Sequence, residues 1–462
     1  MEQKIVRLMA VATPQRDTKW LKDSLQAAIE LELSTLPPYL CGMWSVMDPN
    51  SPPGADAYAL IDSVVREEMT HLGLVCNLLT AIGGTPQIAS GYAGFISYPG
   101  PLPGGVRPQL TVFLGGLTKP YVHDVFMQIE YPEGGPIRFA EVAAAETFPT
   151  IGAFYDAVLE AFNTLSPPLS PANQLTAATG GFAVTVIRTL SDVAAAITLI
   201  KVQGEGTSTS PKAGSELAHY YRFAELYVGR GLVMQGDGSF AFNGPALPFP
   251  DTHTMAPIPK GGYRNPSPAA QSVLIAFDAL FSGMLDTLDV AWGTGSQATL
   301  STAIGLMLKL KAAASPLFVI PLPQREDGFY GPDFKYLPKN ARTQSVPSNA
   351  ITAPVFSDIV ALLQTLTGND PNLGTGSPHG AFWNQSYDAF IAQKTDAWGV
   401  PGNLVVKGDP NSSNLYLALA GKSPFGNFPP QMPDVSLDAN GRIAMPTELQ
   451  TVATWITNGC PK

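Results

Sequence analysis

Three stretches of this chain repeat apolar residues at the spacing of an α-helix, and a glutamate or histidine interrupts each apolar line. Residues three or four apart lie on one helix face, which a globular protein buries. The interrupted lines are Leu21, Leu25, Ile29, Glu32 and Leu36 in 18–36; Ile61, Val64, Glu68, His71, Val75 and Leu78 in 55–82; and Glu216, His219, Phe223 and Leu226 in 214–229. A carboxylate on such a face must be paired or bind a metal, because an unpaired charge in a core is costly.

Two of the five histidines occur in the sequence Glu-x-x-His, one with Glu68 and His71 and one with Glu216 and His219. Because residues three apart share a helix face, each motif offers one carboxylate and one imidazole to a single metal ion. Two such motifs, with glutamates from other helices, form the ligand set of ferritin-like di-iron and di-manganese bundles. The sequence therefore predicts a two-metal site within a helical bundle.

Other glutamates are candidates for the remaining ligands. Glu32 lies on the apolar line, whereas Glu30 lies about 160° away around the helix, so we predict Glu32 as the ligand. Glu130 ends another apolar line, and Glu205 stands between two glycines at a predicted helix end. Either could complete the ligand set. His123 could be a ligand or a donor to one, but we expect a core histidine.

The alternative to a metal site is a set of buried ion pairs, for which Arg66 and Arg222 are the main cations nearby. Two Glu-x-x-His motifs and a third core-facing glutamate favour the metal site. Oxygen and nitrogen ligands without thiolate suit iron or manganese better than structural zinc. We therefore predict two iron ions, with manganese as the alternative, held by Glu32, Glu68, His71, Glu130, Glu205, Glu216 and His219.

Composition excludes several partners. The net charge of −10 and the lack of a basic run argue against nucleic acid or an anionic membrane. Segments 271–292 and 303–322 are interrupted by Asp, Lys or Pro, so neither predicts a membrane span. Three widely spaced cysteines predict reduced thiols, and residues 1–20 lack the apolar core of an export signal. We expect a cytoplasmic protein, with a homo-oligomer left open.

The helices should be joined by long Pro/Gly-rich loops, since the chain has 44 glycines and 43 prolines. Pro37 and Pro38 are expected to kink or interrupt the first helix. Further helices are predicted at about 118–130, 150–165, 182–203, 268–291, 298–316, 355–366, 386–395, 412–420 and 446–458. The Pro/Asn/Ser-rich stretch 336–350 is a predicted linker between domains at 1–335 and 351–462.

Several runs of the first domain are typical of a bacterial ferritin-like domain. They are AIELELSTLPPYL at 28–40, SVVREEMTHL at 63–72, NLLTAIGG at 77–84, FMQIEYP at 126–132, TIGAFY at 150–155, QGEG at 203–206 and ELAHYYRF at 216–223. With these runs, residues 20–320 resemble the domain of the iminophenyl-pyruvate dimer synthases of violacein and rebeccamycin biosynthesis. The resemblance implies a helical bundle, an iron-linked oxidoreductase of secondary metabolism, and ligand roles for Glu32, Glu68, His71, Glu205 and His219.

The C-terminal domain is similar, more loosely, to a small α-helical cytochrome c domain. The similar runs are GSPHGAFW at 376–383, LVVKGDPNSSNLY at 404–416, QMP at 431–433 and WITNGC at 455–460. His379 and Met432 match that family's two haem ligands. Because the Cys-x-x-Cys-His motif is missing, covalent haem attachment is excluded. We favour a domain that has lost its haem over one that binds haem without covalent bonds.

Two functions follow from these patterns. The first is a di-iron oxidase or oxygenase that acts with dioxygen on a small, amino-acid-derived organic substrate. The second is a metal-binding or accessory protein without catalytic turnover. Long loops between ligand-bearing helices more often shape substrate pockets, which favours the enzyme. No separate acid or base residue can be named from the sequence.

Overall fold

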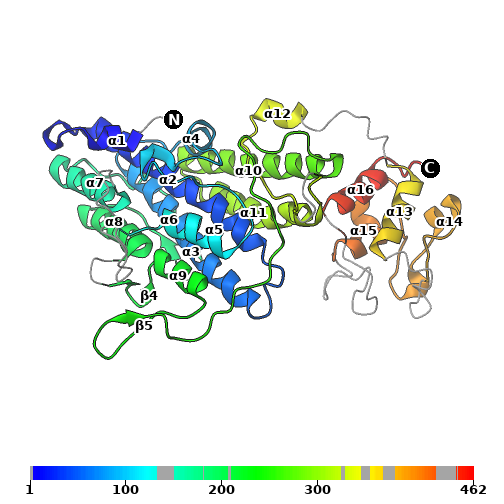
Figure 1. Cartoon of the computed structure of the whole chain (residues 1–462). Coiled ribbons are helices and arrows are strands. Elements are labelled where there is room, and N and C mark those ends of the chain that lie inside the picture. Colours follow the sequence, from blue (N-terminus) through cyan, green and yellow to red (C-terminus); the bar gives the residue numbers. More distant parts are fainter. Residues whose placement is uncertain are drawn as a thin grey trace. The chain divides into compact units, whose positions relative to one another are not determined.

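A computed structural model describes residues 4–132, 150–179, 182–206, 210–323, 328–344, 354–367, 380–422, 444 and 446–462 (Figure 1). The contacts within the chain divide it into two compact units, Met1–Ser345 and Val346–Lys462. Each unit has its own hydrophobic core. The fold is mainly helical, as predicted.

The first unit is built from helices, short helical turns and three pairs of very short strands. The α-helices are α1 (Lys4–Met9), α2 (Thr18–Trp44), α3 (Gly54–Ala81), α4 (Ile88–Phe95), α5 (Lys119–Tyr121), α6 (Met127–Ile129), α7 (Ile151–Leu165), α8 (Leu190–Glu205), α9 (His219–Val228), α10 (Pro268–Thr294), α11 (Gln297–Ala314) and α12 (Lys339–Gln344). The turns are η1 (Thr13–Gln15), η2 (Pro103–Gly105), η3 (Val122–Phe126, a π-helix) and η4 (Ser315–Val319). The strands pair antiparallel as β1 (Ala177–Thr179) with β2 (Phe182–Val184), β3 (Lys212–Ala213) with β4 (Glu216–Leu217), and β5 (Val233–Met234) with β6 (Phe240–Ala241).

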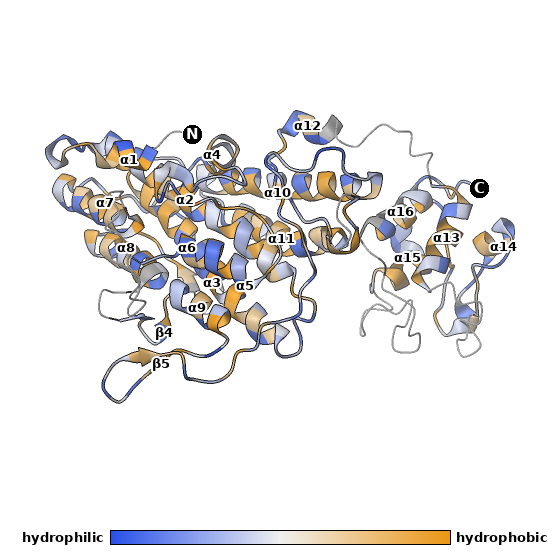
Figure 2. Ribbon diagram, viewed as in Figure 1, coloured by the Kyte–Doolittle hydropathy of each residue, from blue (hydrophilic) through white to orange (hydrophobic). Residues whose placement is uncertain are grey.

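The helices α2 and α3 form the centre of this unit. The two helices pack along each other, with α7, α8 and α9 beside them (Figure 1). Residues of α10 and α11 meet the pair from another side, where Trp292 Nε1 donates a hydrogen bond to Asn77 Oδ1 at 3.1 Å. Figure 2 shows apolar and polar residues on the same helices, as expected of helices with one buried face.

Helix α2 runs through Pro37 and Pro38 without ending, so the predicted interruption is absent, while the alternative of a kink stays a prediction. Asp17 caps its start by accepting a hydrogen bond from the backbone N–H of Trp20 at 2.8 Å. A proline leaves the carbonyl four residues earlier without its helical donor. For Pro38 this is the carbonyl of Ser34, and it accepts a hydrogen bond from the Tyr98 hydroxyl at 2.6 Å. A tertiary contact therefore replaces a helical hydrogen bond.

Two helices begin later than predicted. Helix α8 starts at Leu190, because Thr189 and Asp192 form a capping box there, and residues 182–184 are strand β2. Helix α9 starts only at His219, because residues 212–217 form the hairpin of β3 and β4. The second Glu-x-x-His is therefore not on one helix face.

The predicted linker is partly ordered as part of the first unit, since α12 lies within it. Asp286 of α10 receives a hydrogen bond from the Tyr336 hydroxyl at 2.8 Å and pairs with Arg342 at 2.8 Å. Within the described residues, the stretch Gln297–Val319 is long and apolar enough to cross a membrane by length and composition alone. Our expectation that segment 303–322 does not span a membrane stays a prediction.

The second unit is a small helical domain with its own core. It contains α13 (Phe356–Leu366), α14 (Tyr387–Ala392), η5 (Asp396–Trp398), η6 (Pro410–Ser412), α15 (Asn414–Leu419) and α16 (Pro446–Thr457). Phe390 and Trp455 are buried at its centre. His379 and Met432 lie outside the described residues. The cytochrome c resemblance of this unit stays a prediction.

Candidate metal centre

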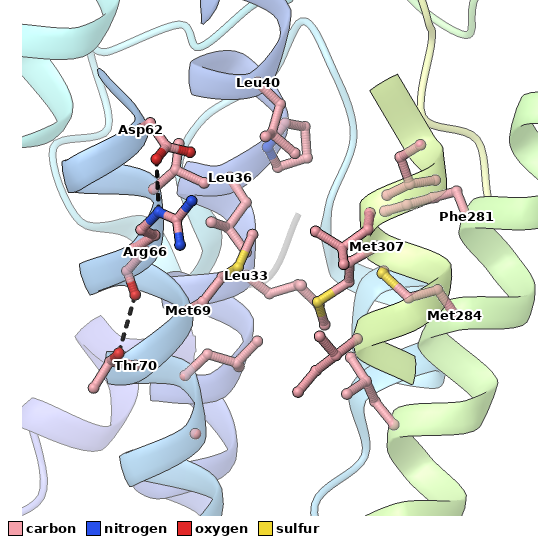
Figure 3. A pocket seen from close by; sticks show the side chains of 18 of the residues that line it. Leu33, Leu36, Leu40, Asp62, Arg66, Met69, Thr70, Phe281, Met284 and Met307 are labelled. Atoms are coloured by element: carbon pink, nitrogen blue, oxygen red, sulfur yellow. Dashed lines mark hydrogen bonds and ion pairs between the residues drawn. The ribbon is translucent and has the colours of Figure 1, made fainter. Parts of the chain in front are cut away.

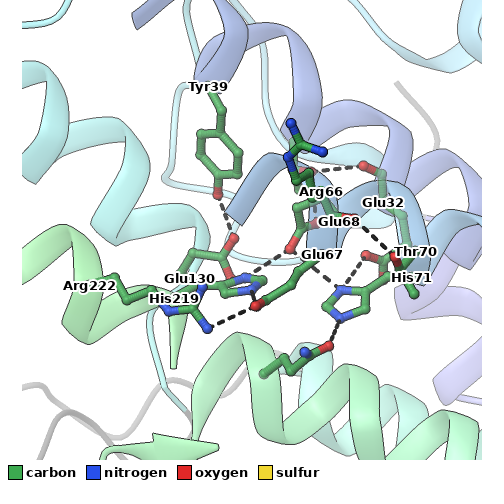
Figure 4. A network of polar contacts seen from close by, with 12 residues as sticks. Glu32, Tyr39, Arg66, Glu67, Glu68, Thr70, His71, Glu130, His219 and Arg222 are labelled. Carbon is green, nitrogen blue, oxygen red and sulfur yellow. Dashed lines mark hydrogen bonds and ion pairs between the residues drawn. The ribbon is translucent and has the colours of Figure 1, made fainter. Parts of the chain in front are cut away.

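Five buried side chains predicted as ligands meet between α2, α3, the end of α6 and the start of α9 (Figure 4). One group comprises Glu32, Glu68 and His71, and the other comprises Glu68, Glu130 and His219. Within each group, the candidate ligand atoms lie within 4.8 Å of one another. Glu68 belongs to both groups, so the geometry offers two neighbouring metal positions that share one carboxylate.

The two imidazoles face this shared carboxylate with the same ring atom. His71 Nδ1 lies 3.5 Å from Glu68 Oε1 and 3.7 Å from Glu32 Oε2. His219 Nδ1 lies 2.9 Å from Glu68 Oε1 and 3.5 Å from Glu130 Oε2. The two rings are stacked, with centroids 5.7 Å apart and planes 22° apart. The two halves of the centre are thus built alike.

The outer nitrogen of each imidazole is held by an oxygen acceptor. His71 Nε2 lies 2.8 Å from Gln203 Oε1 of α8, and His219 Nε2 lies 2.6 Å from Glu67 Oε2. An acceptor at Nε2 favours the tautomer in which Nε2 carries the hydrogen. When the ring is neutral, the Nδ1 lone pair then points into the centre. Partners of this kind orient histidines that bind metals.

The three central carboxylates are held by hydroxyl groups. In each, one oxygen accepts a hydrogen bond from a hydroxyl while the other faces an imidazole. The donors are Tyr155 for Glu32, Tyr39 for Glu130 at 2.6 Å, and Thr35 for Glu68 at 2.9 Å. Because these hydroxyls come from α2 and α7, the packing of the bundle positions each carboxylate.

Burial and neighbouring charges shift the pKa values of the side chains at the centre. Burial raises the pKa of Glu32 and Glu130. Burial acts the same way on Glu68, but the adjacent imidazoles of His219 and His71 outweigh it and lower its pKa. Burial alone would lower the pKa of His71, whereas Glu32 and Glu68 raise that pKa to about 10. The pKa of His219 is also raised well above its ordinary value, by the charge of Glu130 and contacts with Glu67 and Glu68.

The donor set fits metal ions. His219 Nδ1 is buried and makes no hydrogen bond with the described residues, although Glu68 Oε1 is near. The three central carboxylates, of Glu32, Glu68 and Glu130, are buried, and the Glu67 carboxylate is buried beside them. In the described part of the chain, the guanidinium that reaches this group is that of Arg222, 2.9 Å from Glu67. Excess buried negative charge beside an unpartnered imidazole nitrogen is what a cation site requires.

Glu216 is not brought to the centre, which corrects its prediction as a ligand. Its side chain is 59% exposed and pairs with Arg222 at 3.0 Å. The prediction assumed a helix from Gly214, whereas residue 216 lies in strand β4. His219 reaches the centre alone, from the first position of α9.

Other predicted residues have different outcomes. Glu205 ends α8, but its side chain lies outside the described part of the structure. His123 is half-exposed beside Asp124 at 2.7 Å, so it is not the core histidine that we expected. Arg66 pairs with Asp62 at 2.6 Å rather than with the central glutamates. Glu30, set aside in the sequence, pairs with Lys4 at 2.9 Å.

Five positioning residues were missed from the sequence: Thr35, Tyr39, Glu67, Tyr155 and Gln203. Tyr39 follows Glu32 by seven residues, which puts both on one face of α2, so its position carried a usable signal. Glu67 lies about 100° from Glu68 around α3, and nothing in the pattern distinguishes it from a surface glutamate. Tyr155 and Gln203 come from helices whose packing the sequence does not reveal.

A small cavity reaches the centre. It has a volume of about 30 Å³ and is lined by Glu32, Glu68, His71 and Glu130 together with residues of α7 and α8 such as Ile151 and Ile200. A space of this size holds a water molecule. Dioxygen is similarly small. Among the described residues, the cavity has no room for an organic molecule.

A solved structure and a protein-family model match this chain. A crystal structure of a ferritin-like protein from Caulobacter vibrioides is 22% identical, with a match covering 70% of this chain and 99% of that chain and a TM-score of 0.47. A search of curated proteins finds no match. Residues 25–228 match the protein-family model described as Ferritin-like, and this range contains both candidate ligand groups. Residues 25–228 of this chain are therefore a ferritin-like domain, a helical bundle with carboxylate and histidine groups that could hold metal ions.

Proposed function

We propose that the ferritin-like domain binds two iron ions, with manganese as the alternative metal, and is an oxidoreductase that uses dioxygen. One observation carries this proposal: the Glu68 carboxylate belongs to two buried ligand groups, each with one further glutamate and one histidine. A carboxylate shared in this way would be a ligand of both metals. A set of isolated ion pairs would not require one carboxylate to belong to two groups of ligands.

The roles of the residues follow from their contacts. Glu32 and His71 would hold one ion, Glu130 and His219 the other, and Glu68 both. When bound, a pair of ferrous ions supplies the two electrons that reduce dioxygen to the level of hydrogen peroxide. The Tyr39 and Tyr155 hydroxyls keep their protons, because burial raises their pKa, and so remain donors to Glu130 and Glu32.

The size of the cavity limits which substrates can reach the centre. Dioxygen fits the space of about 30 Å³ at the centre, whereas an amino-acid-derived substrate requires the side chains around it to move. The same observation supports the second candidate, a metal-handling protein without turnover of an organic substrate. The two candidates differ in how often dioxygen is consumed.

The test is dioxygen uptake by protein loaded with two equivalents of Fe²⁺ without air and then mixed with aerated buffer. For an oxidoreductase, uptake continues over many cycles when ascorbate and an aromatic amino acid are added. For a metal-handling protein, uptake stops after one event per pair of ions. Both results are consistent with a metal centre, but only continued uptake is consistent with the proposed enzyme.

Matched variants link uptake to the centre. Glu32→Ala removes a candidate ligand, and we expect the rate of uptake to fall by more than the roughly 10- to 100-fold that is typical of losing a partner of a metal ligand. Glu216→Gln is the control, because this glutamate is exposed and outside the centre. Equal rates for Glu32→Ala and the wild-type protein would overturn the proposal, provided that circular dichroism shows both are folded.

A further inference from the structure

A large cavity lies in the first unit, between the α2–α3 pair and the helices α10 and α11 (Figure 3). Its volume is about 410 Å³, more than ten times that of the space at the metal centre. Pockets that bind small organic molecules in proteins have volumes of this order. The cavity is therefore large enough for a ligand of its own.

The cavity is distinct from the metal centre. Met69 lines the cavity and directly follows Glu68 in α3, so its side chain points about 100° away around the helix. Leu33 is related to Glu32 of α2 in the same way. None of the five ligand candidates lines the cavity among the described residues. The helices α2 and α3 thus present metal ligands on one face and an apolar wall on another.

Most of the lining is apolar and adaptable. Leucine and methionine side chains from both helix pairs point into the space in Figure 3, among them Leu33, Leu36, Leu40, Met69, Met284 and Met307. Methionine side chains are flexible and adjust to the shape of an apolar ligand. An elongated hydrocarbon would remove this surface from water, and each further CH₂ group buried should tighten binding about fourfold.

The polar side chains of the lining carry a net positive charge. Tyr58, Asp62 and Arg66 are spaced four residues apart and so form one line along α3. Arg66 Nε donates to Asp62 Oδ2 at 2.6 Å, which uses one of the five N–H donors of the guanidinium. Lys311 of α11 reaches the same line, with Nζ 3.3 Å from the Tyr58 hydroxyl. Lys311 Nζ also lies 4.4 Å from the centroid of the Tyr58 ring, whereas Asp62 pairs with Arg66.

We propose that this cavity binds a long-chain carboxylic acid, with its hydrocarbon chain between the two helix pairs and its carboxylate beside Arg66 and Lys311. The apolar walls select the chain, and two cations against the single anion Asp62 select the acid over a neutral molecule. Arginine suits this task because its planar donors match a carboxylate. This site does not rest on the proposed metal chemistry, so metal-free protein serves for its test.

The test is binding of palmitate to the purified full-length protein, measured by isothermal titration calorimetry below the micelle concentration. We expect one site per chain. Shortening the acid by two CH₂ groups should weaken binding about 15-fold, from the value for each buried CH₂. Arg66→Gln and Lys311→Gln should each weaken palmitate binding several-fold and leave the binding of hexadecanol unchanged.

Two tryptophan variants separate the cavity from the surface. Ile304→Trp places a large ring in the cavity wall and should reduce palmitate binding at least tenfold. Met234→Trp, at a side chain that is 63% exposed on β5, should bind as the wild-type protein does. Equal binding by both variants, or no binding by the wild-type protein, would overturn the proposal. If Ile304→Trp does not fold, the half-exposed Arg66 still provides the test: equal binding of palmitate by Arg66→Gln and the wild-type protein contradicts the carboxylate site.

Discussion

Glu67 Oε2 lies 2.6 Å from His219 Nε2, on the side of the ring opposite the central carboxylates. The other oxygen of Glu67 accepts a hydrogen bond from Arg222 at 2.9 Å. A buried carboxylate held from both sides fixes the orientation of the imidazole ring and the position of its hydrogen. The pair therefore prepares His219 Nδ1 as a metal ligand, although Glu67 faces away from both metal positions.

Loss of this carboxylate should weaken metal binding while all candidate ligands remain. For Glu67→Ala we expect the affinity for Mn²⁺ to fall about 10- to 100-fold, the usual effect of losing a partner of a metal-binding histidine. Glu67→Gln should restore part of it, because the amide oxygen still accepts from Nε2. The measurement is a competition titration with a chelator. Glu216→Gln is the matched control, since it also removes a carboxylate from Arg222. If Glu216→Gln lost as much Mn²⁺ affinity as Glu67→Ala, the role of Glu67 would be contradicted.

Metal binding should release protons. In the metal-free protein the pKa of His71 is about 10, and that of His219 is raised as well, so both rings are charged at neutral pH. Each metal must displace the proton of one Nδ1, and the apparent affinity should rise about tenfold per pH unit between about pH 6 and 8 for each proton released. Adding Mn²⁺ to weakly buffered protein with a pH indicator measures the release. An affinity independent of pH, with no acid released, would contradict these charge states.

The parts of the centre on long helices could be predicted from the sequence. Helices α2 and α3 are strongly periodic, so a glutamate on their apolar lines stands out, as Glu32 and Glu68 did. The bounds of α3 differ by one residue at each end from the predicted 55–82. Helix α9 was harder, because a two-residue strand such as β4 has no periodic signal. For that reason Glu216 was wrongly predicted as a ligand. His219 was predicted from the Glu-x-x-His motif, although the two residues of this motif do not lie on one helix.

The partners of the ligands could not be predicted, because they depend on which helices meet. Gln203 of α8 reaches His71, which is 132 positions earlier in the chain, and Tyr155 of α7 reaches Glu32, 123 positions earlier. Local sequence patterns do not reveal contacts between residues so far apart in the chain. The two prolines of α2 show the same limit, since the effect of Pro38 on the helix is offset by Tyr98 from a distant segment.

Tyr39 should stabilise the metal-free protein through Glu130. Tyr39→Phe keeps the ring but leaves a buried carboxylate without its hydroxyl donor, which typically costs about 1–3 kcal/mol in the free energy of unfolding. Urea unfolding of the metal-free protein measures the change. At Tyr227, where the side chain is 37% exposed, the same replacement should change stability by less than about 0.5 kcal/mol. Equal effects at the two positions would show that the Tyr39–Glu130 contact contributes little.

Metal content tests the shared carboxylate most directly. Purified protein is loaded with Fe²⁺ without air, freed of excess metal by gel filtration, and analysed by inductively coupled plasma mass spectrometry. Because Glu68 belongs to both ligand groups, we expect about two ions per chain in the wild-type protein and in Glu216→Gln, and close to none in Glu68→Ala. The converse result, two ions retained by folded Glu68→Ala or none bound by the wild-type protein, would contradict a two-metal centre at this position.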